Sequence, residues 1–249
     1  MTCRKTSRCW LGSAALVILT ATSATAQENW QWGAEIYFWG ASLGGSTTTG
    51  GDIEVGIDSL LDDLKMGGMA AIGASNGAWS FFADLIYLDV GDSGSVGGTV
   101  GGIPATVNAS MDLKGLISTL GAGYRFYERS GTALDVTGGA WVLWLDGTVT
   151  AAVPPAPQVS ASENGSNWDA VVGLRGRTEL SDRWYMTYYA DVGAGQSDLT
   201  WQAALAFNYE LEKVDLSFCY RYLDWDLNNY GPFDELNMSG AFVGVKIPF

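Results

Sequence analysis

The chain has 249 residues, of which 47% are apolar and 16% charged, with 27 acidic residues, 13 basic residues and no histidine. A formal net charge of −14 argues against nucleic acid as a partner, because phosphate binding needs a basic face. The missing histidine excludes Ser-His and Asp-His hydrolases and most zinc sites. We expect no catalytic site, no cofactor and no bound metal.

The first 26 residues differ in composition from the rest of the chain. Basic residues between positions 4 and 8 precede a short apolar run at 10–19, and Ala-Thr-Ala at 24–26 matches a cleavage site. This pattern is typical of a secretory signal peptide, and the apolar run is too short to span a bilayer as a helix. Cleavage would leave residues 27–249 as one domain, with Cys219 as its lone cysteine and therefore no intramolecular disulfide.

From residue 30 onward, apolar and polar residues alternate with a period of two in runs that are separated by turn signals. In the first run, Trp32, Ile36 and Phe38 share one face, and Glu35 and Tyr37 share the other. The same alternation predicts ten strands, at 30–39, 67–75, 79–87, 115–125, 134–144, 168–179, 184–193, 201–211, 214–222 and 240–249.

Aromatic residues gather at both ends of the apolar face of these runs. Those at one end include Trp30, Trp184 and Phe249, and those at the other include Trp144, Trp168 and Trp201. Two aromatic girdles around an apolar band are typical of a transmembrane barrel, whereas a soluble sandwich would enclose a core rich in Val, Ile and Leu. A closed barrel can lie in lipid because strand pairing satisfies every backbone group. The opposite face is small and polar, which suits a narrow interior.

The connections between the runs alternate in length. Tight turns at 76–77, 128–131, 181–182 and 212–213 alternate with long loops at 43–65, 91–106, 151–167 and 226–235, and with a short one at 196–199. This favours an all-β, antiparallel up-and-down barrel of about ten strands with both termini on the periplasmic side. The ambiguous segment 43–66 leaves eight or twelve strands open. Within it, residues 58–65 can form a short helix capped by Asp58, either folded over the barrel mouth or lying in the loop.

Charged residues on the face opposite the aromatic girdles form the candidate site. A cation on the lipid face would cost roughly 2–4 kcal/mol at mid-membrane, so their confinement to one face is informative. One interpretation is an ion-pair network that fills a narrow barrel; the other is a polar path that selects a solute, narrowest at Asp84, Asp191, Arg175, Arg177 and Arg221. The complete candidate network comprises Asp84, Arg175, Arg177, Asp191, Arg221, Glu35, Arg125 and Lys246.

The C-terminal strand ends in an aromatic residue, Phe249. This ending resembles the signal by which bacterial outer-membrane proteins are handed to their insertion machinery, and the whole chain resembles a small outer-membrane β-barrel protein of Gram-negative bacteria. Three motifs are similar to a set of functionally uncharacterised barrels, namely Trp32-x-x-Glu35 followed by Tyr37-Phe38-Trp39, then Asp58-Ser59-Leu60-Leu61, and Trp168-Asp169 with Gly173-Leu-Arg175. Where those barrels have Asp-Pro after the tryptophan, this chain has Asp169-Ala170.

The resemblance implies an outer-membrane location, reached by secretion through the periplasm, and it carries over no activity. The partners it implies are membrane lipid and the insertion machinery, and the acidic composition is consistent with lipopolysaccharide bridged by divalent cations. We expect a monomeric, non-enzymatic barrel with a structural or surface-interaction role. The alternative is a narrow channel for small hydrophilic solutes.

Overall fold

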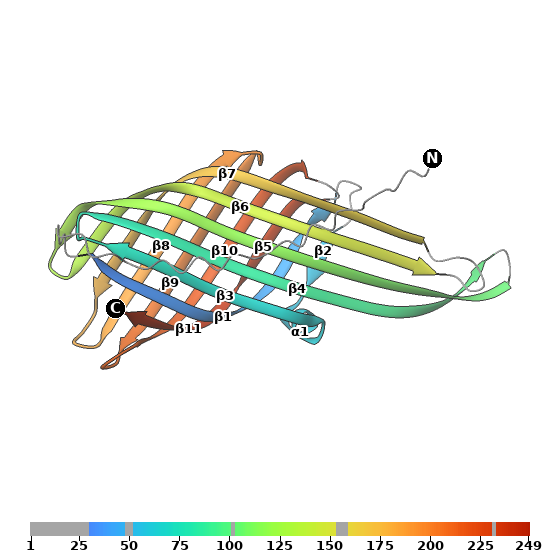
Figure 1. Cartoon of the computed structure of the whole chain (residues 1–249), viewed down its shortest axis with the longest axis horizontal. Coiled ribbons are helices and arrows are strands. Elements are labelled where there is room, and N and C mark those ends of the chain that lie inside the picture. The colour runs from blue at the N-terminus through green and yellow to red at the C-terminus, as the bar shows by residue number, and fades with distance from the viewer. Residues whose placement is uncertain (1–29, 48–51, 101–102, 153–158, 231–232) are drawn as a thin grey trace, which may run out of the picture.

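The computed structural model describes residues 30–47, 52–100, 103–152, 159–230 and 233–249. The predicted signal peptide, residues 1–26, therefore lies outside the described residues. Antiparallel strands make up nearly all of the described chain. They are tilted and form a barrel, which one short helix accompanies (Figure 1). No helix in these ranges is long and apolar enough to cross a membrane.

The described ranges contain eleven strands. They are β1 (Gln31–Thr47), β2 (Asp52–Val55), β3 (Leu64–Ser75), β4 (Trp79–Val100), β5 (Ile103–Arg129), β6 (Thr132–Ala152), β7 (Val159–Glu179), β8 (Trp184–Gly195), β9 (Leu199–Glu210), β10 (Asp215–Tyr230) and β11 (Phe233–Pro248). Ten of these, β1 and β3–β11, form the closed antiparallel wall, and β2 is an extra strand that pairs with β1. The prediction of ten strands is confirmed over the alternatives of eight and twelve.

The ring closes where the first strand meets the last. β1 and β11 pair antiparallel from Gly33↔Pro248 to Thr47↔Phe233. The terminal residue extends this ladder, because the backbone N–H of Trp32 donates to the carbonyl of Phe249 at 3.1 Å and the N–H of Phe249 donates to the carbonyl of Trp32 at 2.9 Å. The aromatic C-terminus is thus part of the closing seam of the barrel.

The exterior of the wall carries the predicted apolar face. Ile36, Val172 and Leu174 are between 55% and 66% exposed on it. Aromatic pairs flank the band, with Trp79–Tyr124 and Trp184–Tyr209 near the short turns and Trp201–Tyr222 at the other end. So large a continuous apolar surface requires a hydrocarbon environment, so the band faces lipid and the end with the short turns is the periplasmic one.

Several segments that were expected to be loops are strands, which corrects the loop boundaries at 91–106, 151–167 and 226–235. β4 and β5 stay paired out to Val100↔Ile103, and β6 and β7 out to Ala151↔Val159. These four strands project beyond the rest of the barrel on the extracellular side (Figure 1). Outside the hydrocarbon a ladder no longer needs apolar side chains facing outward, so these glycine- and serine-rich stretches lack the alternation that marks a membrane strand.

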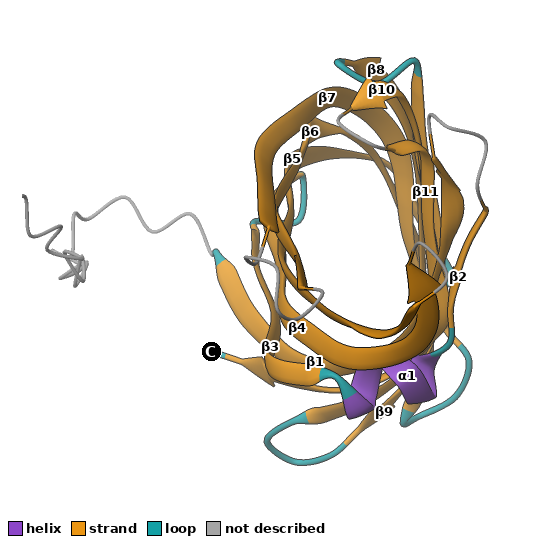
Figure 2. Cartoon of the chain, turned by 90° about the vertical axis from the view of Figure 1, so that its right-hand side faces the viewer, coloured by secondary structure: helices purple, strands orange, loops and turns teal. Residues whose placement is uncertain are grey.

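The predicted loop helix exists with different bounds and a different cap. Helix α1 spans Ile57–Asp62 rather than 58–65, and its N-cap is Gly56, with no side-chain hydrogen bond at the cap. Asp58 lies inside the first turn instead of capping it. Figure 2 shows α1 against the outer side of the ring rather than across its opening, so it does not fold over the barrel mouth.

Candidate functional site

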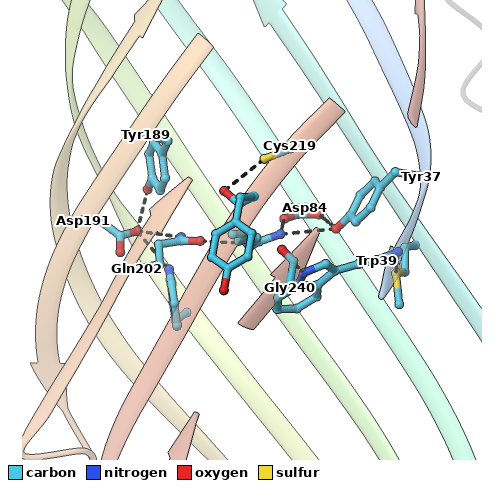
Figure 3. Close-up of polar contacts among 12 residues, drawn as sticks. Tyr37, Trp39, Asp84, Tyr189, Asp191, Gln202, Cys219 and Gly240 are labelled. Carbon is cyan, nitrogen blue, oxygen red and sulfur yellow. Dashed lines mark hydrogen bonds and ion pairs between the residues drawn. The ribbon is translucent and has the colours of Figure 1, made fainter. Parts of the chain in front are cut away.

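Charged and polar side chains from opposite sides of the wall meet in mid-barrel (Figure 3). Asp84 on β4 faces Arg221 on β10, whose Nη1 donates to Asp84 Oδ2 at 2.5 Å. Tyr37 on β1 donates through its hydroxyl to Asp84 Oδ1 at 2.6 Å. The side chain of Arg221 is only 6% exposed, so this ion pair is shielded from solvent.

The contacts continue from Arg221 to the other side of the wall. Arg221 Nε donates to Gln202 Oε1 at 3.1 Å, and Gln202 Nε2 donates to Asp191 Oδ2 at 3.0 Å. The same carboxylate oxygen accepts from the Tyr189 hydroxyl at 2.6 Å and from Trp141 Nε1 at 3.1 Å. We call this set the polar layer; it consists of Tyr37, Asp84, Trp141, Tyr189, Asp191, Gln202 and Arg221.

The two carboxylates of the polar layer are stabilised differently. Asp84 has a buried guanidinium as its direct partner. Asp191, which is 5% exposed, instead accepts three hydrogen bonds from neutral donors. Hydrogen bonds to an ionised oxygen are stronger than neutral ones, so they offset part of the desolvation cost. The layer therefore fits a structural network that fills the barrel.

The interior on the extracellular side of the polar layer is largely apolar. Trp141 and Trp225 meet edge to face with ring centroids 5.1 Å apart, and each is 1% exposed. We call the surrounding cluster the apolar core; it comprises Tyr37, Trp39, Ala41, Ile86, Ile117, Trp141, Leu143, Val171, Leu223, Trp225, Leu227, Leu236 and Met238. The expectation of a small, polar interior is thus wrong for this half, where aromatic and aliphatic side chains fill the space.

The interior on the periplasmic side holds a cavity of about 520 Å³. Its lining includes Glu35, Arg175 and Lys246, and extends to Gln31 and Pro248 near the periplasmic end. We call it the periplasmic cavity. It differs from the apolar core in both charge and free space, so the two halves of the interior suit different contents.

The cations of the periplasmic cavity have separate partners. Arg125 Nε lies 2.9 Å from Asp135 Oδ1, and Arg177 Nη2 lies 2.7 Å from Glu210 Oε1. The guanidinium carbon of Arg177 lies 3.4 Å from the ring centroid of Tyr185, and that of Arg175 lies 5.4 Å from the ring centroid of Phe82. Lys246 Nζ donates a hydrogen bond to Asn208 Oδ1 at 2.6 Å. Because each of these cations already has its own partner, they line the wall of the cavity and do not converge on a single binding centre.

The structure brings together only part of the predicted constriction. Asp84, Asp191 and Arg221 meet in the polar layer, where Asp84 and Arg221 also face the periplasmic cavity. Arg175 and Arg177 line that cavity but make no contact with the polar layer's carboxylates. Glu35, Arg125 and Lys246 also line that cavity. Sequence reasoning missed the neutral members of the polar layer, Tyr37, Trp141, Tyr189 and Gln202. Their signal was present, because all four alternate onto the same face of their strands as the charged residues.

The tryptophan-aspartate motif has a structural role. Asp169 Oδ1 accepts a hydrogen bond from the backbone N–H of Ser197 at 2.8 Å, and Gln196 Oε1 accepts one from the N–H of Trp168 at 2.9 Å. Both contacts join β7 to the connection between β8 and β9. The side chain of Asp169 is 1% exposed, so it is not available to a solute.

No protein-family model and no curated protein matches the chain. Among solved structures, it is similar to the outer membrane protease OmpT of Escherichia coli, with 9% identity, 92% of this chain and 99% of that one covered, and a TM-score of 0.50. It is also similar to the translocator domain of the autotransporter NalP of Neisseria meningitidis, with 16% identity, 88% of each chain covered and a TM-score of 0.43.

At these identities the similarity concerns the fold alone. That fold agrees with the closed ten-stranded wall and the exposed apolar band. The chain is therefore a transmembrane β-barrel of the bacterial outer-membrane type.

Proposed function

We propose that the chain is a non-enzymatic outer-membrane barrel with a structural and surface-interaction role, whose interior is closed to ions. The observation that carries this proposal is the apolar core. Trp141, Leu143 and Trp225 are each 1% exposed in the path that a solute would need. A hydrophobic constriction without room for water is a barrier to ions.

The fold similarity to a protease does not argue for hydrolysis here. The chain contains no histidine, which removes the usual general base of hydrolytic sites. Of the two carboxylates nearest mid-barrel, the half-buried Asp84 is paired with Arg221, and the buried Asp191 accepts hydrogen bonds from neutral donors. Asp84 also lines the periplasmic cavity, but its side-chain partners are Arg221 and Tyr37 rather than a general base.

The projecting part of β4–β7 supports a role at the cell surface. β7 pairs with β8 only from Asp169↔Gly195 onward, so within the described residues the stretch from Val159 to Asn167 has no strand partner on that side. An uncovered edge presents unpaired N–H and C=O groups, to which an extended peptide can add a strand. We infer that an extracellular protein segment binds here through its backbone.

Planar-bilayer recording tests the closed interior. The purified barrel is expected to give no steady single-channel current, whereas the double variant Trp141→Ala/Trp225→Ala, which removes the two largest side chains of the apolar core, is expected to conduct. The variant serves as a positive control for reconstitution. Steady wild-type currents that change with Arg175→Ala or Asp191→Asn would replace this proposal with the narrow channel for small hydrophilic solutes, which the charged periplasmic cavity favours.

Trimming the projecting strands tests the surface role. A variant with the β4–β5 and β6–β7 hairpins shortened to the level of the β8–β9 connection should still insert, because the membrane-spanning ladders remain. Cells that display it are expected to lose adherence to matrix-coated surfaces and to one another. Equal adherence of cells with full-length and trimmed barrels would contradict a surface role for this sheet.

A further inference from the structure

The wall of the barrel is interrupted between β1 and β3. β1 pairs with β3 only from Gln31 to Ile36, and with β2 from Leu43 to Ser46. Within the described residues, positions 37–42 of β1 have no strand partner on this side, and neither do positions 64–69 of β3. We call this gap the β1–β3 seam.

Side chains rather than backbone hydrogen bonds close the seam. The backbone N–H of Trp39 points across it and donates to the thioether sulfur of Met69 at 3.2 Å. A thioether is a weak acceptor, so this contact replaces a ladder bond poorly. The seam is therefore a place where the wall can open without breaking strand pairing.

A cavity of about 100 Å³ lies in the seam. Trp39, Leu88 and Met238 line it from the interior, and Phe38 and Gly68 belong to the lipid-facing side of the strands. No charged side chain is among its described lining residues. An apolar cavity of this kind stays dry, and its lining lacks dispersion contacts until an apolar group fills it.

Helix α1 covers the cavity from the lipid side. Gly40 lies on the same outward face of β1 as Phe38, and a Cβ at Gly40 would lie 3.3 Å from Ile57 Cδ1. Ile57 and Leu61 both line the cavity, and Leu61 remains 43% exposed. The helix therefore lies outside the ring (Figure 2), with Ile57 and Leu61 against the cavity and with Asp58 and Asp62 exposed, as expected for a helix at the edge of the hydrocarbon.

The seam lies in the outer-leaflet half of the wall. Two ion pairs on the outer surface, Lys65–Asp112 and Lys114–Asp89, lie level with the beginning of β3. Charged side chains avoid the hydrocarbon, so these pairs mark its extracellular boundary. The seam extends from this boundary toward mid-membrane, where lipid acyl chains surround the barrel.

We propose that the β1–β3 seam is a binding site for one acyl chain of an outer-leaflet lipid, with α1 as its cover. The cavity is continuous with the lipid-facing band, where Ile36 and Met66 are 66% and 57% exposed on either side. An apolar protein cavity of about 150 Å³ holds a benzene molecule, so this smaller one fits a short length of chain and excludes a headgroup.

Photo-crosslinking in lipid vesicles tests the site. The full barrel is reconstituted into phosphatidylcholine vesicles that contain a phospholipid with a diazirine at the end of one acyl chain, irradiated, digested and analysed by mass spectrometry. Peptides covering 57–69 are expected to carry more adduct than peptides covering 170–176, which belong to the exposed band on β7. Equal labelling of the two segments in the wild-type barrel would overturn the proposal.

Two substitutions fill the cavity. Gly67→Leu extends a side chain into it, with a Cβ at ordinary contact distance, 3.6 Å, from Leu64 and Leu88. Leu61→Trp fills it from the cover helix and leaves the strand ladders intact. Each is expected to reduce labelling of 57–69 to the level of the exposed band. Excess labelling that persists in both variants would overturn the proposal.

Matched controls separate an acyl-chain occupant from a headgroup and from a general effect of added bulk. Gly138→Leu makes the same substitution on the lipid-facing side of β6, where the nearest atom to a Cβ is 3.9 Å away. It is expected to leave the labelling of both 57–69 and 170–176 unchanged. A diazirine on the headgroup is expected to show no preference for 57–69, and a preference equal to that of the chain probe would contradict an acyl-chain occupant. These outcomes do not depend on whether the interior conducts.

Discussion

Replacing Arg221 with methionine is expected to lower the free energy of unfolding by about 3–5 kcal/mol, because it leaves the carboxylate of Asp84, which is 19% exposed, without its cation. Gln202 Oε1 also loses the hydrogen bond that Arg221 Nε donates, so the contact between the two halves of the polar layer is lost. Urea titration of the barrel in vesicles measures the loss, and heat-modifiable gel migration reports it as a lower unfolding temperature.

Two comparisons isolate the buried charge as the cause. The double variant Arg221→Met/Asp84→Leu is expected to recover much of the lost stability, because no uncompensated charge remains. Arg177→Met removes an ion pair whose two side chains are each 41% exposed, and its effect should stay below about 1 kcal/mol. A loss for Arg221→Met no larger than that for Arg177→Met would show that the polar layer does not stabilise the barrel.

Replacing Ile72 with arginine is expected to block insertion or to destabilise the inserted barrel by roughly 2–4 kcal/mol, because the side chain would face lipid. Ile72 is 46% exposed on the outer face of β3. Its neighbour Ala71 lines the periplasmic cavity and pairs in register with Glu35 and Asp84. Ala71→Arg is therefore expected to be much milder, since an added cation there meets two carboxylates.

The two β3 variants form a matched pair, since they place the same side chain one residue apart. Outer-membrane fractionation followed by heat-modifiable migration gives the inserted fraction of each. If both insert equally well, the assignment of lipid-facing and interior-facing residues on β3 is wrong. If Ala71→Arg is the more severe, the periplasmic cavity is too confined to accept a charged side chain.

Much of the wall could be predicted from the sequence because lipid imposes a strict rule on each membrane-spanning residue. Ile36, Val172 and Leu174 had to face outward, and Glu35 and Asp84 had to face inward, once the period of two was recognised. The aromatic girdles and tight turns then set the strand number. A charged residue on the lipid face costs so much free energy that the alternation of apolar and polar residues is strict, and it can therefore be recognised in the sequence.

The projecting strands, helix α1 and the interior of the barrel do not face lipid in this way, so their sequences are not constrained by it. The projecting parts of β4–β7 lie in water, where strands and loops can have the same composition. Gly56 replaced Asp58 as the helix cap because the bounds of α1 depend on its contact with β1. The polar layer depends on which interior residues meet across the barrel, and Asp84 and Arg221 are 137 positions apart in the sequence.

The ladder between β1 and β11 also bears on how the protein is assembled. Trp39 and Gly240 are in contact although 201 positions separate them, so the cylinder is incomplete until the final strand arrives. Pairings this distant along a chain make folding slow. During biogenesis the edge of β1 that faces β11 therefore has no partner until nearly the whole polypeptide is delivered, and until then it is open to wrong strand pairings.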